Sequence, residues 1–284
     1  MDSTLKLPTK TVNDWLILVD NHASSPLQAE HGFSILIRYE GNKILFDTGQ
    51  EAIIHNAEYL QERLDDIRHL VISHGHYDHT GAIHQLLSFS PQLHIWANPA
   101  ITQPHYNHKE DQIYDIGIPE PDRQALSHFP PEQFYSVEGK LYLNPRIGIC
   151  SPIPRNHPLE DTGGLFHHDP EGMTCDQIEE ESALWLETPE GLIIVTGCCH
   201  AGFINTCEHI RRLTGIRKIQ CVIGGFHLIS AGPARIRETG AYIIDTDIRE
   251  IVACHCTGDE AAMALKEIIH SRLTSGYAGM HRPI

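Results

Sequence analysis

A short run of histidines and one aspartate carries the most specific chemistry in this sequence. Within "VISHGHYDHTGAI" (71–83), His74, His76, Asp78 and His79 fall within six positions, directly after an apolar run. Imidazole and carboxylate groups are typical ligands of divalent transition metals. Residues two apart on a strand point the same way, so we expect His74 and His76 to bind one ion. Asp78 and His79 follow where the chain should turn into a helix, and there they can face a second ion.

Two ions held side by side would provide a defined reactivity. Paired metals can share one hydroxide, lower its pKa and stabilise the charge of a transition state. Each ion needs further ligands, and the second half places a histidine after three apolar segments: His200 after "LIIVTGCC", His227 after "CVIGGF" and His255 after "EIVAC". A lone histidine after a strand is usually structural. Three in succession favour metal ligation, above all for His200 and His255.

The surrounding sequence alternates between two patterns. Apolar, β-branched segments predict strands, and apolar residues at helical spacing predict helices between them. The predicted strands are 15–20, 33–39, 43–49, 67–73, 182–188, 191–197, 218–226 and 250–255, and the predicted helices are 51–64, 201–213, 234–244 and 259–273. Residues 104–146 are rich in Pro, His and Asp and indicate an irregular insertion within a single domain that spans residues 1–284.

The two halves of the chain resemble each other. "NKILFDTGQ", a helix and "DIRHLVISHGH" match "GLIIVTGCC", a helix and "GIRKIQCVIGGFH" at an offset of about 150 residues, with chance similarity as the alternative. A repeated strand–turn–helix–strand unit predicts two β-sheets face to face with helices outside, which is an α/β four-layer αββα sandwich. Such a fold brings the strand ends of both halves to one edge, where the histidines lie.

Composition and charge limit the class of function. With 41% hydrophobic and 20% charged residues, the chain has the composition of an ordinary globular protein. The formal charge of −16 argues against nucleic acid as a partner but allows an anionic small molecule, because a bound dication supplies local positive charge.

The apolar runs are far shorter than the roughly 20 residues of a membrane span, and the N-terminus does not match a signal peptide. We therefore expect a cytoplasmic protein with a small-molecule substrate and no membrane partner, and a homo-oligomer stays open.

The eight cysteines form no C-x-x-C pair, which excludes a zinc ribbon and a thioredoxin-type motif. For a cytoplasmic chain, free buried thiols are the ordinary interpretation. Four of the eight adjoin histidines, in "GCCH" and "ACHC". Because neighbours on a strand face opposite ways, we expect Cys199, Cys254 and Cys256 to turn away from the site. Cys198 shares the face of His200 and is a candidate ligand.

A family resemblance follows from these motifs. "HGHYDH", with "DTG" upstream and histidines at later strand ends, resembles the metallo-β-lactamase superfamily over essentially the whole chain. More narrowly, "EHGFSILI", "ILFDTGQ", "SHGHYDHTGAI", "TGCCHAGFINT", "VIGGFHL" and "HCTG" resemble the branch typified by the archaeal dihydropterin-ribofuranosylaminobenzene-phosphate synthase, from about residue 15 to 260.

The resemblance implies a role for each motif residue. It implies one metal bound by His74, His76 and His200, and a second metal bound by Asp78, His79 and His255. Asp78 is also the catalytic carboxylate that we expect. The "DTG" aspartate, Asp47, is implied to orient a ligand imidazole and to sharpen its basicity.

One position departs from the superfamily pattern. The usual bridging aspartate, expected between His200 and His255, has no obvious equivalent, and His227 stands at the corresponding strand end. A neutral imidazole does not bridge two cations as a carboxylate does, so we expect His227 to bind one ion or to orient substrate. In the "AEHGF" loop, His31 is the expected substrate contact, with an exposed loop residue as the alternative. The "EDTGGLF" segment (160–166) fits a mobile flap or an ordinary turn.

Three functions are compatible with these residues. The leading one is a dinuclear metal-dependent hydrolase of a small ester or phosphoester, with a pterin-related substrate implied by the resemblance alone. Mixed imidazole and carboxylate ligands suit zinc, iron and manganese. Iron would also permit an oxygenase on the same fold, which His227 favours. A non-catalytic metal-binding or ligand-binding protein is the third.

Overall fold

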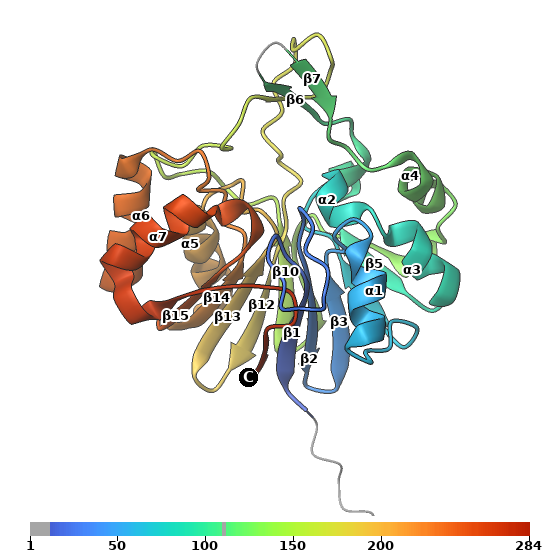
Figure 1. The fold of residues 1–284 in the computed structure, drawn as a ribbon, viewed down its shortest axis with the longest axis horizontal. Helices are drawn as coiled ribbons and strands as arrows, with labels where there is room; N and C mark the ends of the chain where they lie inside the picture. The colour runs from blue at the N-terminus through green and yellow to red at the C-terminus, as the bar shows by residue number, and fades with distance from the viewer. Residues whose placement is uncertain (1–11, 110–111) are drawn as a thin grey trace, which may run out of the picture.

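Two seven-stranded β-sheets lie face to face in this computed structural model, which describes residues 12–109 and 112–284 (Figure 1). In spatial order, the first sheet contains β17 (His281–Pro283), β1 (Asp14–Val19), β2 (Ser34–Tyr39), β3 (Asn42–Phe46), β4 (His69–Val71), β5 (His94–Ala97) and β8 (Phe134–Ser136). The second contains β16 (Leu273–Ser275), β15 (Glu250–Ala253), β14 (Ile219–Gly224), β13 (Gly191–Thr196), β12 (Ala183–Thr188), β10 (Ile147–Ser151) and β9 (Gly139–Asn144).

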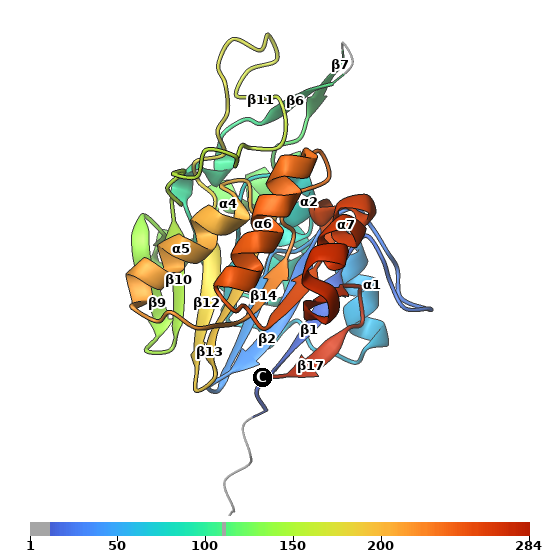
Figure 2. The same ribbon diagram turned by 90° about the vertical axis from the view of Figure 1, so that its left-hand side faces the viewer.

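Helices cover the outer face of each sheet (Figures 1 and 2). The first sheet carries α1 (Ala52–Tyr59) and α3 (Ile83–Phe89), with α4 (Glu120–Ser127) packed against α3. The second carries α5 (Phe203–Thr214), α6 (Pro233–Asp245) and α7 (Asp259–Ile269). Short helical turns complete the described elements: α2 (Tyr77–Thr80), η1 (Pro99–Thr102), η2 (Pro131–Gln133), η3 (His255–Thr257) and η4 (His270–Arg272). Within the two described ranges, none of the helices is long and apolar enough to cross a bilayer.

Three apolar clusters fill the spaces between the four layers. Ile37 of β2 and Val195 of β13 belong to the cluster between the sheets, whereas Leu36 of β2 packs outward with α1 and α3. Trp185 of β12 packs outward with α5, α6 and α7. Successive strand residues point to opposite faces, and both faces of each sheet are buried, so the central strands are apolar throughout. The predicted αββα sandwich is confirmed.

The two halves of the chain share one strand plan. In the first sheet β1, β2 and β3 are antiparallel neighbours, and β4 and β5 then run parallel to β3. In the second sheet β10, β12 and β13 are antiparallel, and β14 and β15 then run parallel to β13. This correspondence accounts for the internal sequence similarity. It also places the carboxyl ends of all these parallel strands at the same edge of the molecule (Figure 1).

The segment 104–146 holds more regular structure than the sequence predicts. A hairpin of β6 (Tyr106–Lys109) and β7 (Gln112–Asp115) joins β11 (Phe166–His167) in a third sheet, which projects above the edge that holds the histidines (Figures 1 and 2). β8 and β9 extend the two main sheets. An irregular insertion is therefore the wrong description. These strands are short and largely exposed, so each contributes too few apolar residues for a strand to be recognised from the sequence pattern.

A packing prediction concerns Gly148 of β10, which pairs with Trp185 of β12. A Cβ on Gly148 would overlap the indole ring of Trp185, which is fully buried. We expect Gly148→Ala to lower the free energy of unfolding by about 1–3 kcal/mol, because a close-packed ring has no room to shift. The measurement is the midpoint of urea denaturation. Gly232→Ala is the control, since a Cβ there has open space within 4 Å, and an unchanged midpoint for both variants would contradict this packing.

Candidate metal centre

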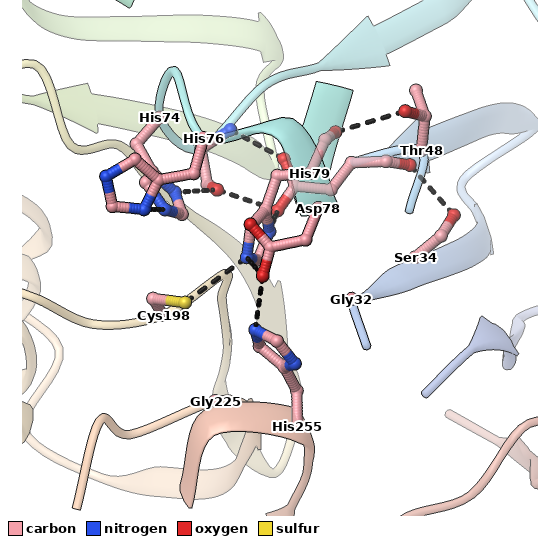
Figure 3. A network of polar contacts seen from close by, with 12 residues as sticks. Gly32, Ser34, Thr48, His74, His76, Asp78, His79, Cys198, Gly225 and His255 are labelled. Atoms are coloured by element: carbon pink, nitrogen blue, oxygen red, sulfur yellow. Dashed lines mark hydrogen bonds and ion pairs between the residues drawn. The ribbon is translucent and has the colours of Figure 1, made fainter. Parts of the chain in front are cut away.

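The predicted ligands meet at the edge where the parallel strands of both sheets end (Figure 3). His74 and His76 follow β4, His200 follows β13, His227 follows β14 and His255 follows β15. All five line one cavity or adjoin it, with ring-to-ring contacts from His74 to His200 and from His200 to His227. Segments more than a hundred residues apart in sequence therefore bring their imidazoles together.

The loop that carries His74 and His76 is not the strand that we expected. β4 ends at Val71, because the backbone N–H of Ser73 donates to Asp47 Oδ1 at 2.7 Å instead of joining the ladder. The two histidines lie in the loop between β4 and α2. Their ring nitrogens nevertheless face each other, with His74 Nε2 3.0 Å from His76 Nδ1.

The first donor set consists of His74, His76 and His200. All three are buried, and one potential ligand atom of each lies within 4.8 Å of those of the other two. Nε2 of His200 and Nε2 of His76 are buried and have no hydrogen-bond partner in the described part of the chain. Buried polar atoms are nearly always satisfied, so this arrangement fits a cation between the rings.

The second donor set consists of Asp78, His79 and His255. Asp78 Oδ2 lies 3.2 Å from His255 Nε2 and 3.8 Å from His79 Nε2 (Figure 3). His31 joins the set from the loop before β2, with Nε2 also 3.2 Å from Asp78 Oδ2. The side chain of His31 is half exposed, whereas the other three are buried. Its predicted role as a substrate contact stays a prediction, and its position at the rim agrees with that role.

Hydrogen bonds to Nδ1 fix the orientation of four rings. The acceptors are Ser73 Oγ for His74 at 2.8 Å, Asp47 Oδ2 for His79 at 2.7 Å, Thr162 O for His200 at 2.9 Å and Asn21 Oδ1 for His255 at 2.9 Å. When Nδ1–H donates to oxygen, Nε2 keeps its lone pair for a metal. The hydroxyl of Ser73 donates in turn to Asp47 Oδ2 at 2.7 Å, so one buried carboxylate orients a ring of each donor set.

Burial and neighbouring charges set the protonation states. Burial lowers the pKa of His74, His76 and His200 well below its usual value, and adjacent imidazoles lower it further. These rings are therefore neutral and able to bind a cation. Burial disfavours the Asp78 anion, but His79, His255 and His31 outweigh burial and hold its pKa well below the usual range. Burial likewise opposes the charge on His79, yet Asp78 and Asp47 raise its pKa.

Several strand ends adopt a left-handed backbone conformation. The φ angles are +57° at Asp47, +61° at Cys199, +43° at His227 and +45° at His255, within three residues of the ends of β3, β13, β14 and β15. Such conformations in non-glycine residues cost of order 1–3 kcal/mol each and concentrate at functional sites. At Asp47, His227 and His255 the residue with positive φ is itself at the site, and at Cys199 the turn comes between Cys198 and His200, which line the cavity.

Both donor sets open on a cavity of about 450 Å³. Its floor includes His76, Asp78, His200, His227 and His255. The wall opposite contains residues 107–109 of β6, including Lys109, and the rim contains Leu165 and Ile229, whose side chains are largely exposed. This volume falls within the range of small-molecule sites.

Comparison with known proteins identifies the family. Residues 27–171 match the model described as the metallo-beta-lactamase superfamily. The chain belongs to this superfamily. It is 32% identical over 263 residues to the 7,8-dihydropterin-6-methyl-4-(beta-D-ribofuranosyl)-aminobenzene-5'-phosphate synthase of Methanocaldococcus jannaschii, with 84% of each chain covered.

Solved structures agree with that assignment. Tm1679, described as a metal-dependent hydrolase of the beta-lactamase superfamily, superimposes with a TM-score of 0.79 at 25% identity, covering 96% of this chain and 99% of its own. The zinc-bound PqqB of Methylobacterium extorquens has a TM-score of 0.57 at 11% identity, covering 95% of this chain and 100% of its own, and shows a shared fold. The superfamily is typically metal-dependent, and the two donor sets of this chain fit such ions.

His227 lies just after β14, at the strand end where we expected the superfamily's bridging aspartate. Its ring centroid lies 4.2 Å from that of His200, and its Nδ1 is buried without a hydrogen-bond partner among the described residues. The aspartates between His200 and His255 in the sequence, Asp245 and Asp247, lie at the end of α6 and just after it. The place of His227 beside the first donor set fits a ligand or a substrate contact, and both roles stay predictions.

The prediction that strand alternation turns three cysteines away from the site holds for two of them. Cys199 packs into the core beneath α5 and Cys254 into the core between the sheets, so both turn away from the site as predicted. The prediction for Cys256 is wrong, because Cys256 lines the cavity beside His255. The chain forms the 3₁₀ turn η3 there, and strand alternation does not apply to a helical turn. Cys198 also lines the cavity.

Sequence reasoning missed two buried groups that support the donor sets. Glu181 accepts hydrogen bonds from the backbone N–H groups of His200 and Ala201, and burial raises its pKa to about 7. His105 packs against His76 and donates from Nδ1 to Asp176 Oδ2 at 2.6 Å. Glu181 lies in the acidic run "EEES", typical of a surface, and His105 lies in the Pro-rich segment. In neither place does the sequence signal burial.

A substitution of Asp47 tests whether the residues that orient the donor rings contribute to metal binding. Asp47→Asn keeps the shape of the side chain but replaces a charged acceptor of the His79 and Ser73 hydrogen bonds. We expect the affinity for the metal to fall about 10- to 100-fold, as for other groups that orient ligands. Competition with a chromophoric chelator measures the affinity.

The matched control is Asp122→Asn. Asp122 is equally buried and also accepts a backbone N–H and a ring nitrogen contact, both from His84, outside the site. It should lose stability without losing metal affinity. Unchanged affinity in the Asp47 variant would show that His79 does not bind metal.

Proposed function

We propose that this protein is a dinuclear metal-dependent hydrolase of a small ester or phosphoester. The observation that carries the proposal is the convergence of two donor sets on one cavity. His74, His76 and His200 would hold one ion, and Asp78, His79 and His255 would hold the other. Imidazole and carboxylate ligands suit zinc, iron or manganese.

Bound divalent ions supply Lewis acidity and a water of lowered pKa. The protein's own residues would orient and deprotonate that nucleophile. Asp78 is ionised and lies in the cavity, where it can accept a hydrogen bond from the attacking water. His31 lies 3.2 Å from Asp78 at the solvent-facing rim and is placed to pass a proton outward. The water oxygen bonds to the acyl carbon or phosphorus, the bond to the leaving oxygen breaks, and the leaving alcohol takes up a proton.

The walls of the cavity suggest an amphipathic substrate with an anionic group. Lys109 and His108 contribute a cation and a ring donor from β6, close to the donor sets. Leu165 and Ile229 provide an apolar rim, with 70% and 65% of their surface exposed. Because the relative from Methanocaldococcus jannaschii is named for a dihydropterin phosphate, a pterin-bearing phosphoester is the first specific compound to test.

The experiment begins with the full chain purified without added metal. Elemental analysis should find about two ions per chain, and a chelator should abolish hydrolysis of bis-p-nitrophenyl phosphate until zinc, manganese or iron is restored. We expect Asp78→Asn to lower kcat/KM at least about 100-fold, the scale of a lost acid–base group. Asp14→Asn should keep full activity, because Asp14 is a buried carboxylate paired with Arg38 and His281 at the opposite end of β1.

Two other outcomes would replace this proposal. Iron with consumption of oxygen during turnover would indicate an oxygenase, the alternative that the histidine-rich site favours. Full metal occupancy without turnover of esters, phosphoesters or thioesters would indicate a protein that binds ligand without catalysis.

A further inference from the structure

The sulfur of Cys198 lies between the two donor sets. It is 3.2 Å from His79 Nε2, a member of the second set (Figure 3). It also lies within 4.8 Å of ligand atoms of His74 and of His200, which belong to the first set, and of His255, which belongs to the second. The Cys256 sulfur is the other thiol in this neighbourhood, but the Cys198 sulfur is near ligand atoms of both donor sets, where two neighbouring ions would lie.

The backbone holds Cys198 in this place. Cys198 follows β13 in the "TGCCH" turn, and a Cβ on the preceding residue, Gly197, would lie 2.7 Å from Asp47 Oδ2. Glycine is required there because the turn runs directly over the carboxylate that orients His79. On the other side, the N–H of Gly225 donates to the Gly197 carbonyl at 2.9 Å. The sulfur is therefore positioned by contacts from both halves of the molecule.

Charge balance at the centre calls for a second anion. Among the described residues that line the cavity, Asp78 is the one carboxylate, and an imidazole ligand brings no negative charge to a metal ion. Two divalent ions bring four positive charges, and a coordinated thiol loses its proton and contributes a negative charge. Zinc and iron both accept thiolate together with imidazole.

We propose that the Cys198 sulfur is a direct ligand of the metal centre, placed between the two ions as a bridging anion. The inference rests on the proposed dinuclear centre and adds a ligand to it. In the metal-free protein the Cys198 thiol faces the lone pair of His79 Nε2, and the ion would take the place of the proton that the two atoms share.

Cys256 is the competing thiol, and its contacts distinguish it. Its sulfur donates to the backbone carbonyl of Cys198 at 3.5 Å. Cys256 belongs to a potential ligand group with Cys198 and His255, whereas Cys198 also belongs to groups that contain His74 or His200. Cys256 therefore lies next to the second donor set, whereas Cys198 is near both sets.

The test uses cobalt(II) as a spectroscopic substitute in the full-length, reduced protein under anaerobic conditions. A thiolate ligand produces a near-ultraviolet charge-transfer band, and zinc-loaded protein should show a sulfur shell at about 2.3 Å by X-ray absorption. We expect Cys198→Ser to lose both signals. Its affinity for metal should fall by more than the ten- to hundredfold that is typical of groups that only orient ligands.

Matched variants identify which cysteine binds the metal. Cys199→Ser is the control, because Cys199 is the adjacent buried thiol and its sulfur contacts Thr206 instead of the site. It should keep the band, and so should Cys256→Ser. Cys198→Asp should lose the band but recover most of the metal occupancy, because a carboxylate can also bridge two ions. That recovery would also show that the position tolerates substitution.

The outcomes also separate this inference from the proposed function. Two bound cobalt ions without a charge-transfer band would overturn Cys198 ligation and leave the dinuclear centre intact. A band that is lost in Cys256→Ser and kept in Cys198→Ser would assign the sulfur to Cys256 instead. Failure of the wild-type protein to bind metal at all would refute the centre itself.

Discussion

The site depends on one physical constraint: neutral imidazoles crowded in a buried space need a cation among them. His74 Nε2 and His76 Nδ1 face each other at 3.0 Å, and His200 Nε2 is buried without a partner in the described ranges. A neutral imidazole carries one N–H, so a hydrogen bond can join this pair, but Nε2 of His76 and Nε2 of His200 then still lack a partner among the described residues. Burial lowers the pKa of His74, His76 and His200 and thereby disfavours their imidazolium forms, which leaves these lone pairs free for a metal ion. A divalent ion satisfies several rings at once, and the rest of the fold can be understood as the means of holding them there.

The fold meets this constraint by bringing equivalent strand ends of two similar halves to one edge. Asp47 follows β3 in the first half, and Cys199 follows β13, the corresponding strand, in the second; both have a positive φ. His227 and His255 repeat this conformation after β14 and β15. The strain at each turn is small compared with the binding energy of a metal, which is about 10–16 kcal/mol in structural zinc sites. Part of that binding energy can therefore offset the strain and keep the turns at this edge in one conformation.

The sequence was sufficient for the layers and for the edge at which the histidines gather, because both depend on strong local patterns. Apolar strands separated by helices predict the sandwich, and closely spaced histidines at strand ends predict where the rings gather. The predictions failed where local pattern and tertiary contact disagree. The backbone N–H of Ser73 bonds to Asp47 instead of to the ladder, Cys256 lies in a helical turn, and β8 and β9 extend the sheets although none of their residues is fully buried. The buried groups that support the donor sets, such as Glu181, are recognised by contacts between distant segments of the chain. The spacing of residues along one segment does not show these contacts.

Charge acts on a ligand in two ways, through the net charge of the whole protein and through charged groups within the cavity. The formal charge of −16 disfavours the approach of any anion, but salt screens such fields within roughly 8 Å at physiological ionic strength. A small anion is therefore selected by groups within a few ångströms of it. The cavity has such groups in Lys109 and His108, and the donor sets would add positive charge with the ions that they are proposed to hold. Under this proposal an acidic protein would bind an anionic ester through groups inside the cavity, against the repulsion of its net charge.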